Sequence, residues 1–185
     1  MDNQKLYITQ RTPMGDDDIR RFLGQKVKII EFNELDNYNN INRLLPKKVD
    51  YCIILYGIKA VNNGHWVSLF KRDNIISFFD SYGIKPEVPL KKWITQEHNE
   101  AMEQDGNLLI KLLNTHKGNV FYNNYSYQDN TNFDISTCGR WAVSFIQFMK
   151  MNKNHTLRSY NKFILELKKN HTELENDEIV SLLVN

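Results

Sequence analysis

The sequence contains only two cysteines, Cys52 and Cys138, and they lie far apart in the chain. Two distant cysteines make neither a disulfide framework nor a zinc-binding pattern, and a reducing compartment fits them best. Apart from His65 the histidines show no ligand spacing relative to one another or to a cysteine; they are His98, His116, His155 and His171. We therefore expect neither a bound metal nor another cofactor.

Long apolar runs and a large excess of one charge are also missing. No apolar run approaches the length that a membrane-spanning helix needs. Residues 1–5 lack the apolar core of a secretory signal, so we expect no membrane partner and no secretion. The net charge of +2 is too slight to indicate a nucleic-acid-binding protein.

The composition is that of a folded protein. With 185 residues, 41% of them hydrophobic and 12% aromatic, the chain is long enough for one sizeable core and too short for two comfortable domains. We expect residues 1–185 to form a single domain. Asparagine is frequent, as in residues 37–42, and together with many lysines this indicates an AT-rich genome.

Apolar periodicity predicts an α+β fold, with an antiparallel or mixed sheet flanked by helices. The expected strands are 27–32, 51–56, 64–70, 75–83 and 120–122. The expected helices are 15–24, 40–45, most of 93–116 with a break near 105–106, 138–151, 157–168 and 176–184. Residues 1–14 look extended, as a loose arm or an edge strand, and Asn176, Asp177 and Glu178 suit the amino-terminal cap of the last helix.

The helix expected over residues 138–151 is central to the functional interpretation. Its apolar residues Ala142, Phe145, Ile146 and Met149 recur at helical spacing, whereas Arg140, Ser144, Gln147 and Lys150 form a polar stripe. Cys138 lies in the first turn, in line with the apolar residues, so its sulfur should point inward. Backbone amides and the helix dipole stabilise a thiolate at such a position, and a cationic partner stabilises it further.

A predicted hairpin supplies that partner. Its strands are joined by the short polar segment 71–74. If the turn is centred on Arg72 and Asp73, His65 lies directly opposite Asp80. Opposed residues of an antiparallel pair point to the same face, so an imidazole is placed beside a carboxylate.

Four residues together match the needs of a cysteine nucleophile. Cys138 would attack, His65 would take and return the proton, and Asp80 would fix the tautomer of the imidazole. The side-chain amide of Gln128 and the backbone amide of Cys138 would bind the oxyanion.

Taken singly, each of these residues has a structural interpretation. A cysteine at a helix start is more often a buried small residue, and an aspartate before Ser-Tyr-Gly is most simply a turn residue. The joint occurrence favours chemistry. Cys52, within an apolar strand, is instead expected to be a structural core thiol.

The order of these motifs resembles a known family. Gly64-His65-Trp66, a strand ending in Asp80-Ser81, then Gln128, then Thr137-Cys138-Gly139 at a helix start are similar to the adenovirus maturation protease and the ubiquitin-like-protein (SUMO) proteases. The resemblance covers roughly residues 50 to 150. The order His, Asp, Cys distinguishes this group from papain, where the cysteine comes first.

The resemblance implies a papain-like fold in circularly permuted order and a thiol endopeptidase with His65, Asp80, Cys138 and Gln128 as catalytic residues. Trp66 and Gly139 would line a cleft that admits narrow, Gly-containing sequences. Gln128 lies ten positions before Cys138, a longer gap than in the family, so we expect an enlarged loop there.

Three functions remain open. The short chain and the asparagine bias favour a viral or virophage maturation protease that cuts capsid or core precursors, in the virus factory of the host cytoplasm or packaged in the virion. A DNA or peptide activator, as in the adenovirus relative, is left open. The alternatives are an isopeptidase that removes ubiquitin-like modifiers and a binding module with a silent site.

Overall fold

The computed structural model describes residues 2–57, 64–92, 94–104, 106–129, 131–132 and 134–185. In these ranges the strands are β1 (Lys28–Glu31), β2 (Val49–Gly57), β3 (Gly64–Arg72), β4 (Ile75–Asp80) and β5 (Asn119–Tyr122). The helices are α1 (Asn3–Arg11), α2 (Asp16–Leu23), the 3-10 helix η1 (Phe32–Asn37), α3 (Ile41–Leu44), α4 (Val88–Lys92), α5 (Gln96–Ala101), α6 (Leu108–Asn114), α7 (Cys138–Met151), α8 (Leu157–Asn170) and α9 (Asn176–Leu183). The predicted α+β class is confirmed.

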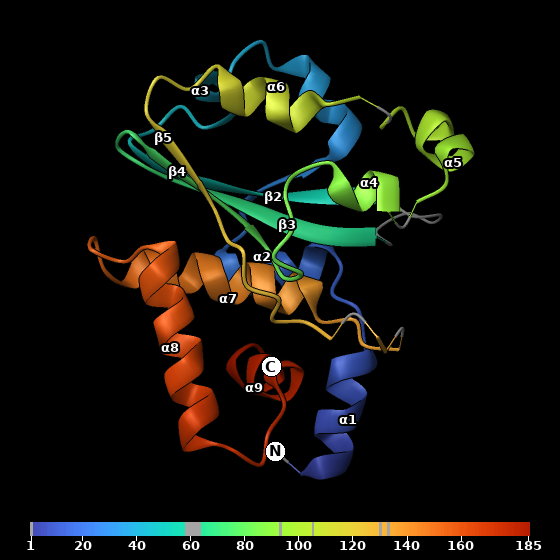
Figure 1. The fold of residues 1–185 in the computed structure, drawn as a ribbon, viewed down its shortest axis with the longest axis vertical. Helices are drawn as coiled ribbons and strands as arrows, with labels where there is room; N and C mark the ends of the chain where they lie inside the picture. Colours follow the sequence, from blue (N-terminus) through green and yellow to red (C-terminus); the bar gives the residue numbers. More distant parts are fainter. Residues whose placement is uncertain (1, 58–63, 93, 105, 130, 133) are drawn as a thin grey trace.

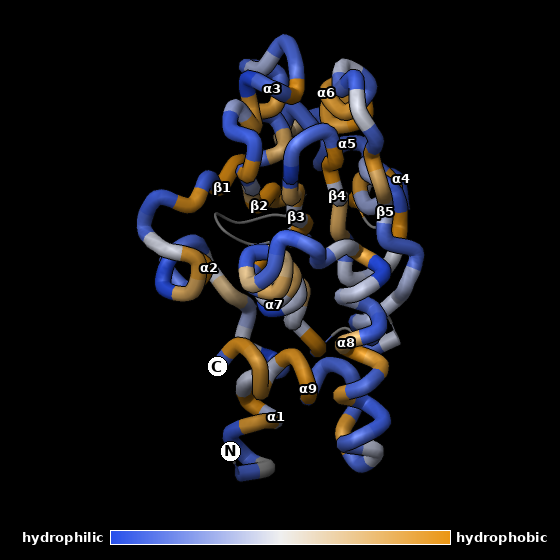
Figure 2. Tube along the Cα trace, turned by 90° about the vertical axis from the view of Figure 1, so that its left-hand side faces the viewer, coloured by the Kyte–Doolittle hydropathy of each residue, from blue (hydrophilic) through white to orange (hydrophobic). Residues whose placement is uncertain are grey.

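The strands form one mixed sheet in the order β1-β2-β3-β4-β5. The inner strands β2, β3 and β4 pair antiparallel, and β1 and β5 join in parallel at the two edges. Helices α2 and α7 lie against one face, and α3, α4 and α6 lie over the other (Figure 1). Hydrophobic segments lie in the strands and also in helices such as α6 and α9, whereas the outer loops are mostly hydrophilic (Figure 2). Both faces are therefore buried, as the apolar sequence of β2 predicts.

The hairpin of β3 and β4 exists, but its register differs from the predicted one. Arg72 pairs with Ile75, so only Asp73 and Asn74 form the turn, and Asp73 takes a positive φ of 52°. The turn is centred one residue later than predicted, and this shifts the pairing by two positions. Asp80 is therefore opposite Val67, and His65 is its diagonal neighbour on the same face.

Helix α7 is more deeply buried than its sequence pattern predicts. The apolar face packs on the sheet, where the rings of Phe79 and Phe145 stack at 4.7 Å. Part of the predicted polar stripe is also covered. Arg140 donates to the carbonyl of Thr12 at 2.7 Å, and Ser144 accepts a hydrogen bond from the Tyr160 hydroxyl at 3.1 Å.

The extended conformation expected for residues 1–14 is wrong, because most of this segment forms α1. The Asp2 carboxylate caps the helix by accepting from the backbone nitrogen of Lys5 at 2.8 Å. Helix α1 lies beside α9 at the end of the molecule that carries both termini (Figure 1). Its sequence has weak helical periodicity, so packing on α9 is what selects the helix.

The segment expected to be mostly helical over residues 93–116 contains α5 and α6 with a break between them. The break near residues 105–106 is confirmed, although Asp105 and Trp93 lie outside the described residues. A further short helix, α4, precedes this segment. Among the described residues, no helix is long and apolar enough to cross a membrane.

Candidate active site

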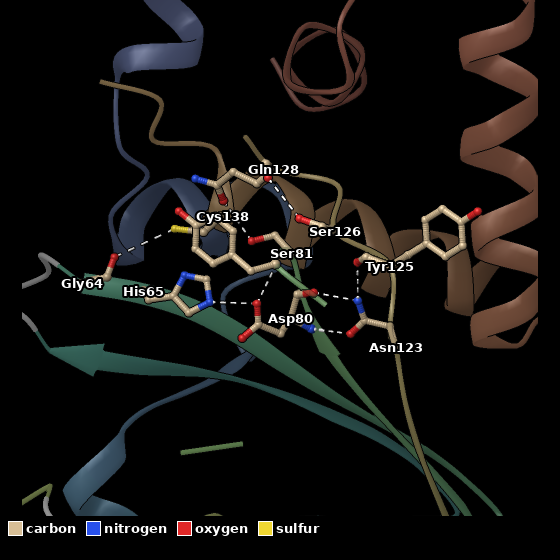
Figure 3. A network of polar contacts seen from close by, with 10 residues as sticks. Gly64, His65, Asp80, Ser81, Asn123, Tyr125, Ser126, Gln128 and Cys138 are labelled. Atoms are coloured by element: carbon tan, nitrogen blue, oxygen red, sulfur yellow. Dashed lines mark hydrogen bonds and ion pairs between the residues drawn. The ribbon is translucent and has the colours of Figure 1, made fainter. Parts of the chain in front are cut away.

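Cys138 is the first residue of α7, as its sequence context predicts. Its side chain is partly buried, and its thiol donates to the carbonyl oxygen of Gly64 at 3.9 Å, a distance within the range for sulfur. Gly64 is the first residue of β3, directly before His65, so the start of this strand and the start of α7 meet (Figure 3). The helix places the sulfur where the positive end of its dipole is strongest.

His65 lies between Asp80 and Cys138 (Figure 3). Its Nε2 atom is 3.1 Å from Oδ1 of Asp80, and both side chains are buried. The imidazole also interacts with the Cys138 side chain through a hydrogen bond. Because Nε2 faces Asp80, Nδ1 is the ring nitrogen on the side of the Cys138 sulfur. The ring stacks against Tyr82 with centroids 5.0 Å apart, which fixes its plane.

The protonated form of His65 is strongly favoured. Burial by itself lowers the pKa of the imidazole, but the charge and contact of Asp80, and then those of Cys138, outweigh it and raise the pKa to about 10. An imidazolium at neutral pH can stabilise a thiolate beside it and later donate its proton.

Asp80 is fully buried and held by several hydrogen bonds. Its Oδ1 accepts from the backbone nitrogen of Tyr82 at 2.7 Å. Asn123 clamps its backbone on both sides: Oδ1 accepts from the Asp80 nitrogen and Nδ2 donates to the Asp80 oxygen, each at 2.7 Å. Nδ2 of Asn123 also donates to the carbonyl of Tyr125 at 3.1 Å (Figure 3).

Sequence reasoning missed Asn123. In a chain so rich in asparagine its residue type carried no signal, and its position just after β5 was the only clue. The side chain acts on the active site through the backbone of a neighbouring strand, a contact that only the folded sheet creates.

Gln128 lies on the Cys138 side of the same network (Figure 3). Its Oε1 accepts from the Ser81 hydroxyl at 2.9 Å, and its Nε2 donates to the carbonyl of Ile135 at 3.2 Å. These bonds orient the amide and leave its second N–H hydrogen as the one that an oxyanion would take. The role of Gln128 as an oxyanion donor stays a prediction.

Trp66 and Gly139, the predicted cleft residues, are packed under the amino-terminal segment. The Trp66 indole nitrogen donates to the carbonyl of Met14 at 2.9 Å, and the side chain is 2% exposed. A Cβ atom on Gly139 would lie 2.9 Å from Cβ of Met14 and 3.2 Å from Cδ1 of Trp66. Only glycine fits this close approach, and contact of these two residues with substrate stays a prediction.

The remaining candidates are structural or isolated. Cys52 is fully buried, and burial raises the pKa of its thiol to about 12, as expected of a core residue. Within the described ranges, no group of three or more His, Cys, Asp and Glu side chains could hold a metal ion.

The chain is similar in sequence to a virophage protein. The chain is 30% identical over 181 residues to the uncharacterized protein V9 of Sputnik virophage, covering 97% of this chain and 98% of V9. No protein-family model matches. Two crystal structures of the African swine fever virus (ASFV) pS273R protease are similar, with TM-scores of 0.49 and 0.47 and identities of 15% and 14%. They cover 94% of this chain, which spans about two thirds of that protease (67% and 66%). A structural similarity this distant does not determine an activity.

Proposed function

The chain belongs to the family of protein V9 of Sputnik virophage, and we propose that it is a cysteine endopeptidase with Cys138 as its nucleophile. His65 is the general acid and base, and Gln128 binds the oxyanion. Asp80 orients the imidazole and stabilises its protonated form. The observation that carries the proposal is the position of His65, which contacts a buried carboxylate on one side and the sulfur at a helix start on the other.

The reaction follows from these contacts. The Cys138 thiolate attacks the carbonyl carbon of the scissile peptide bond, and the negative charge moves to the carbonyl oxygen. The Gln128 amide and the backbone amide of Cys138 stabilise that oxyanion. His65 then gives its proton to the leaving amine, and an acyl-enzyme remains. Neutral His65 next takes a proton from water, which attacks the thioester and regenerates the thiolate.

The proposed setting is virion maturation. The motif order is similar to that of the adenovirus maturation protease, and the V9 relative belongs to a virophage. The substrates would be capsid or core precursors cut at Gly-containing sites, and the enzyme would act in the virus factory or inside the particle. Activation by a peptide or by DNA is left open, and adding each to the cleavage assay tests it.

The test is cleavage of a diverse peptide library, read by mass spectrometry, for the wild type, Cys138→Ala and Cys52→Ala. We expect cuts by the wild type and by Cys52→Ala, and none by Cys138→Ala. Equal cutting by Cys138→Ala would refute the proposal. An unreactive Cys138 would also refute the proposal. If iodoacetamide labels Cys138 no faster than a model thiol near neutral pH, the enzyme does not stabilise a thiolate at this position.

The same preparation separates the alternatives. Cuts at internal Gly-containing sites support an endopeptidase. Reaction only with a ubiquitin-like modifier that carries a carboxy-terminal electrophile would indicate an isopeptidase. Absence of both reactions in a folded protein, with added peptide and DNA, would indicate a binding module.

A further inference from the structure

The carboxylate of Asp177, on α9, joins the two segments on either side of the candidate oxyanion site. It is 3% exposed. Its Oδ2 accepts from the backbone nitrogen of Asp129 at 2.8 Å, and its Oδ1 accepts from the Trp141 indole nitrogen at 3.0 Å. Oδ1 also accepts from the hydroxyl of Thr137. Asp129 directly follows Gln128, and Thr137 directly precedes Cys138.

Thr137 departs from the usual behaviour of a residue at a helix start. It is the N-cap of α7, where a threonine hydroxyl normally accepts from an amide of the first turn. Here the side chain makes no such bond, and its hydroxyl donates to Asp177 instead. The amides of the first turn are therefore not occupied by their own cap, and uncapped amides at a helix start bind anions.

We propose that Asp177 is a positioning residue for the oxyanion site. Its carboxylate holds the segment after Gln128 and the start of α7 at a fixed separation, and it keeps the Thr137 hydroxyl away from the helix amides. This inference rests on the proposed protease function. It adds a residue of α9, a helix that carries none of the four proposed catalytic residues.

The hydrogen bonding accounts for a charge at this depth. Burial raises the pKa of the Asp177 carboxyl, and the bonds from Asp129, Thr137 and Trp141 oppose that shift by stabilising the ionised form. Buried carboxylates are tolerated when their oxygens are fully hydrogen-bonded. A protonated carboxyl would lose one acceptor, whereas the Asp129 amide and the Trp141 indole can only donate.

The variant Asp177→Asn tests this arrangement because it keeps the shape and removes one acceptor. One of its two amide atoms is an NH2 group, which cannot accept from the Asp129 amide or from the Trp141 indole. A small displacement of the oxyanion donors lowers kcat, and we expect a loss of about tenfold to hundredfold with KM within about twofold of wild type. Each rate is divided by the concentration of reactive Cys138 found by titration, so that unfolded protein does not lower the kcat.

The matched control is Glu178→Gln, which makes the same charge change on the next residue of α9. The Glu178 carboxylate accepts only from the backbone nitrogen of Glu175 in the described contacts, so kcat should stay at the wild-type value. An NMR readout independent of activity follows the indole N–H of Trp141. The sequence has three tryptophans, and only the Trp141 indole signal should move upfield in Asp177→Asn.

The outcomes separate this inference from the proposed function. A moved indole signal with wild-type kcat per titrated site would overturn the positioning role and leave the protease intact. A folded wild type without any cleavage would overturn both. If Asp177→Asn does not fold, Thr137→Val removes one of the three donors at similar shape. We expect it to lower kcat by roughly threefold to tenfold, and unchanged kcat would again overturn the inference.

Discussion

Replacing Asp80 with asparagine should remove the pH dependence of stability that the buried His65 creates. The folded-state pKa of His65 is raised from 6.5 to about 10, with Asp80 as the main cause of the increase. A raised histidine pKa contributes stability that is complete below pH 6.5 and is lost as pH rises towards about 10. Wild-type stability should therefore fall across this range.

The magnitude follows from the size of the shift. At about 1.4 kcal/mol per pH unit, a rise from 6.5 to about 10 corresponds to at most roughly 5 kcal/mol. Breaking a buried ion pair by removing one partner costs about 3–5 kcal/mol. We therefore expect Asp80→Asn to lower the free energy of unfolding by about 3 kcal/mol near pH 6.5, and the deficit should narrow as pH rises.

The assay is urea unfolding followed by tryptophan fluorescence at several pH values between about 6.5 and 10. Asp17→Asn is the control, because Asp17 is exposed and the charge change is the same. Its curve should run parallel to the wild type. The reasoning would be refuted if Asp80→Asn kept the wild-type slope. It would also fail if Cys138→Ala alone abolished that slope, since Asp80 would then not be the main cause.

Three further predictions concern the scaffold. Gly64→Ala should destabilise by about 3 kcal/mol in urea unfolding, because its Cβ would lie 2.0 Å from the carbonyl oxygen of Tyr56; wild-type stability would contradict this. Arg72→Ala should cost about 2 kcal/mol, since its guanidinium donates to carbonyl oxygens at the end of α7 and just beyond it. Arg72→Lys should recover only part of that loss, and full recovery would count against the multiple bonds. Burial raises the pKa of Glu87 to about 7 from 4.5, so wild-type stability should fall between these pH values. Glu87→Gln should match the wild type below pH 4.5 and be more stable by roughly 1–3 kcal/mol above pH 7; parallel pH curves would show that Glu87 is not the cause.

The sequence alone was sufficient for the main elements around the site. Helical periodicity and the short polar connection predict α7 and the β3–β4 hairpin, because both signals depend on residues close together in the chain. The same local signals place Cys138 at the helix start and bring His65 to the side of Asp80. The catalytic roles of these residues remain predictions, to be decided by the cleavage experiment.

The hairpin register shows the limit of local reasoning. The choice between a turn centred on Arg72 and Asp73 and the observed turn at Asp73 and Asn74 involves a positive φ at Asp73, which aspartate tolerates but does not require. The contact between His65 and Asp80 survives the error because a shift of two residues preserves the face of the sheet. A shift of one residue would have abolished it.

Tertiary structure decided the features that depend on distant segments. Helix α1 forms where the sequence favours an extended arm, because α9 lies beside it. Asp177 fits the predicted amino-terminal cap of α9 by residue type, yet Glu175 is the N-cap and the Asp177 carboxylate turns to Thr137, Trp141 and Asp129. Propensity and periodicity describe neighbours along the chain, whereas a buried polar side chain bonds to the donors that folding brings to it. The sequence therefore determined which residue types lie at the candidate site, and the packing of α9, β5 and the loop before α7 decided how they are held.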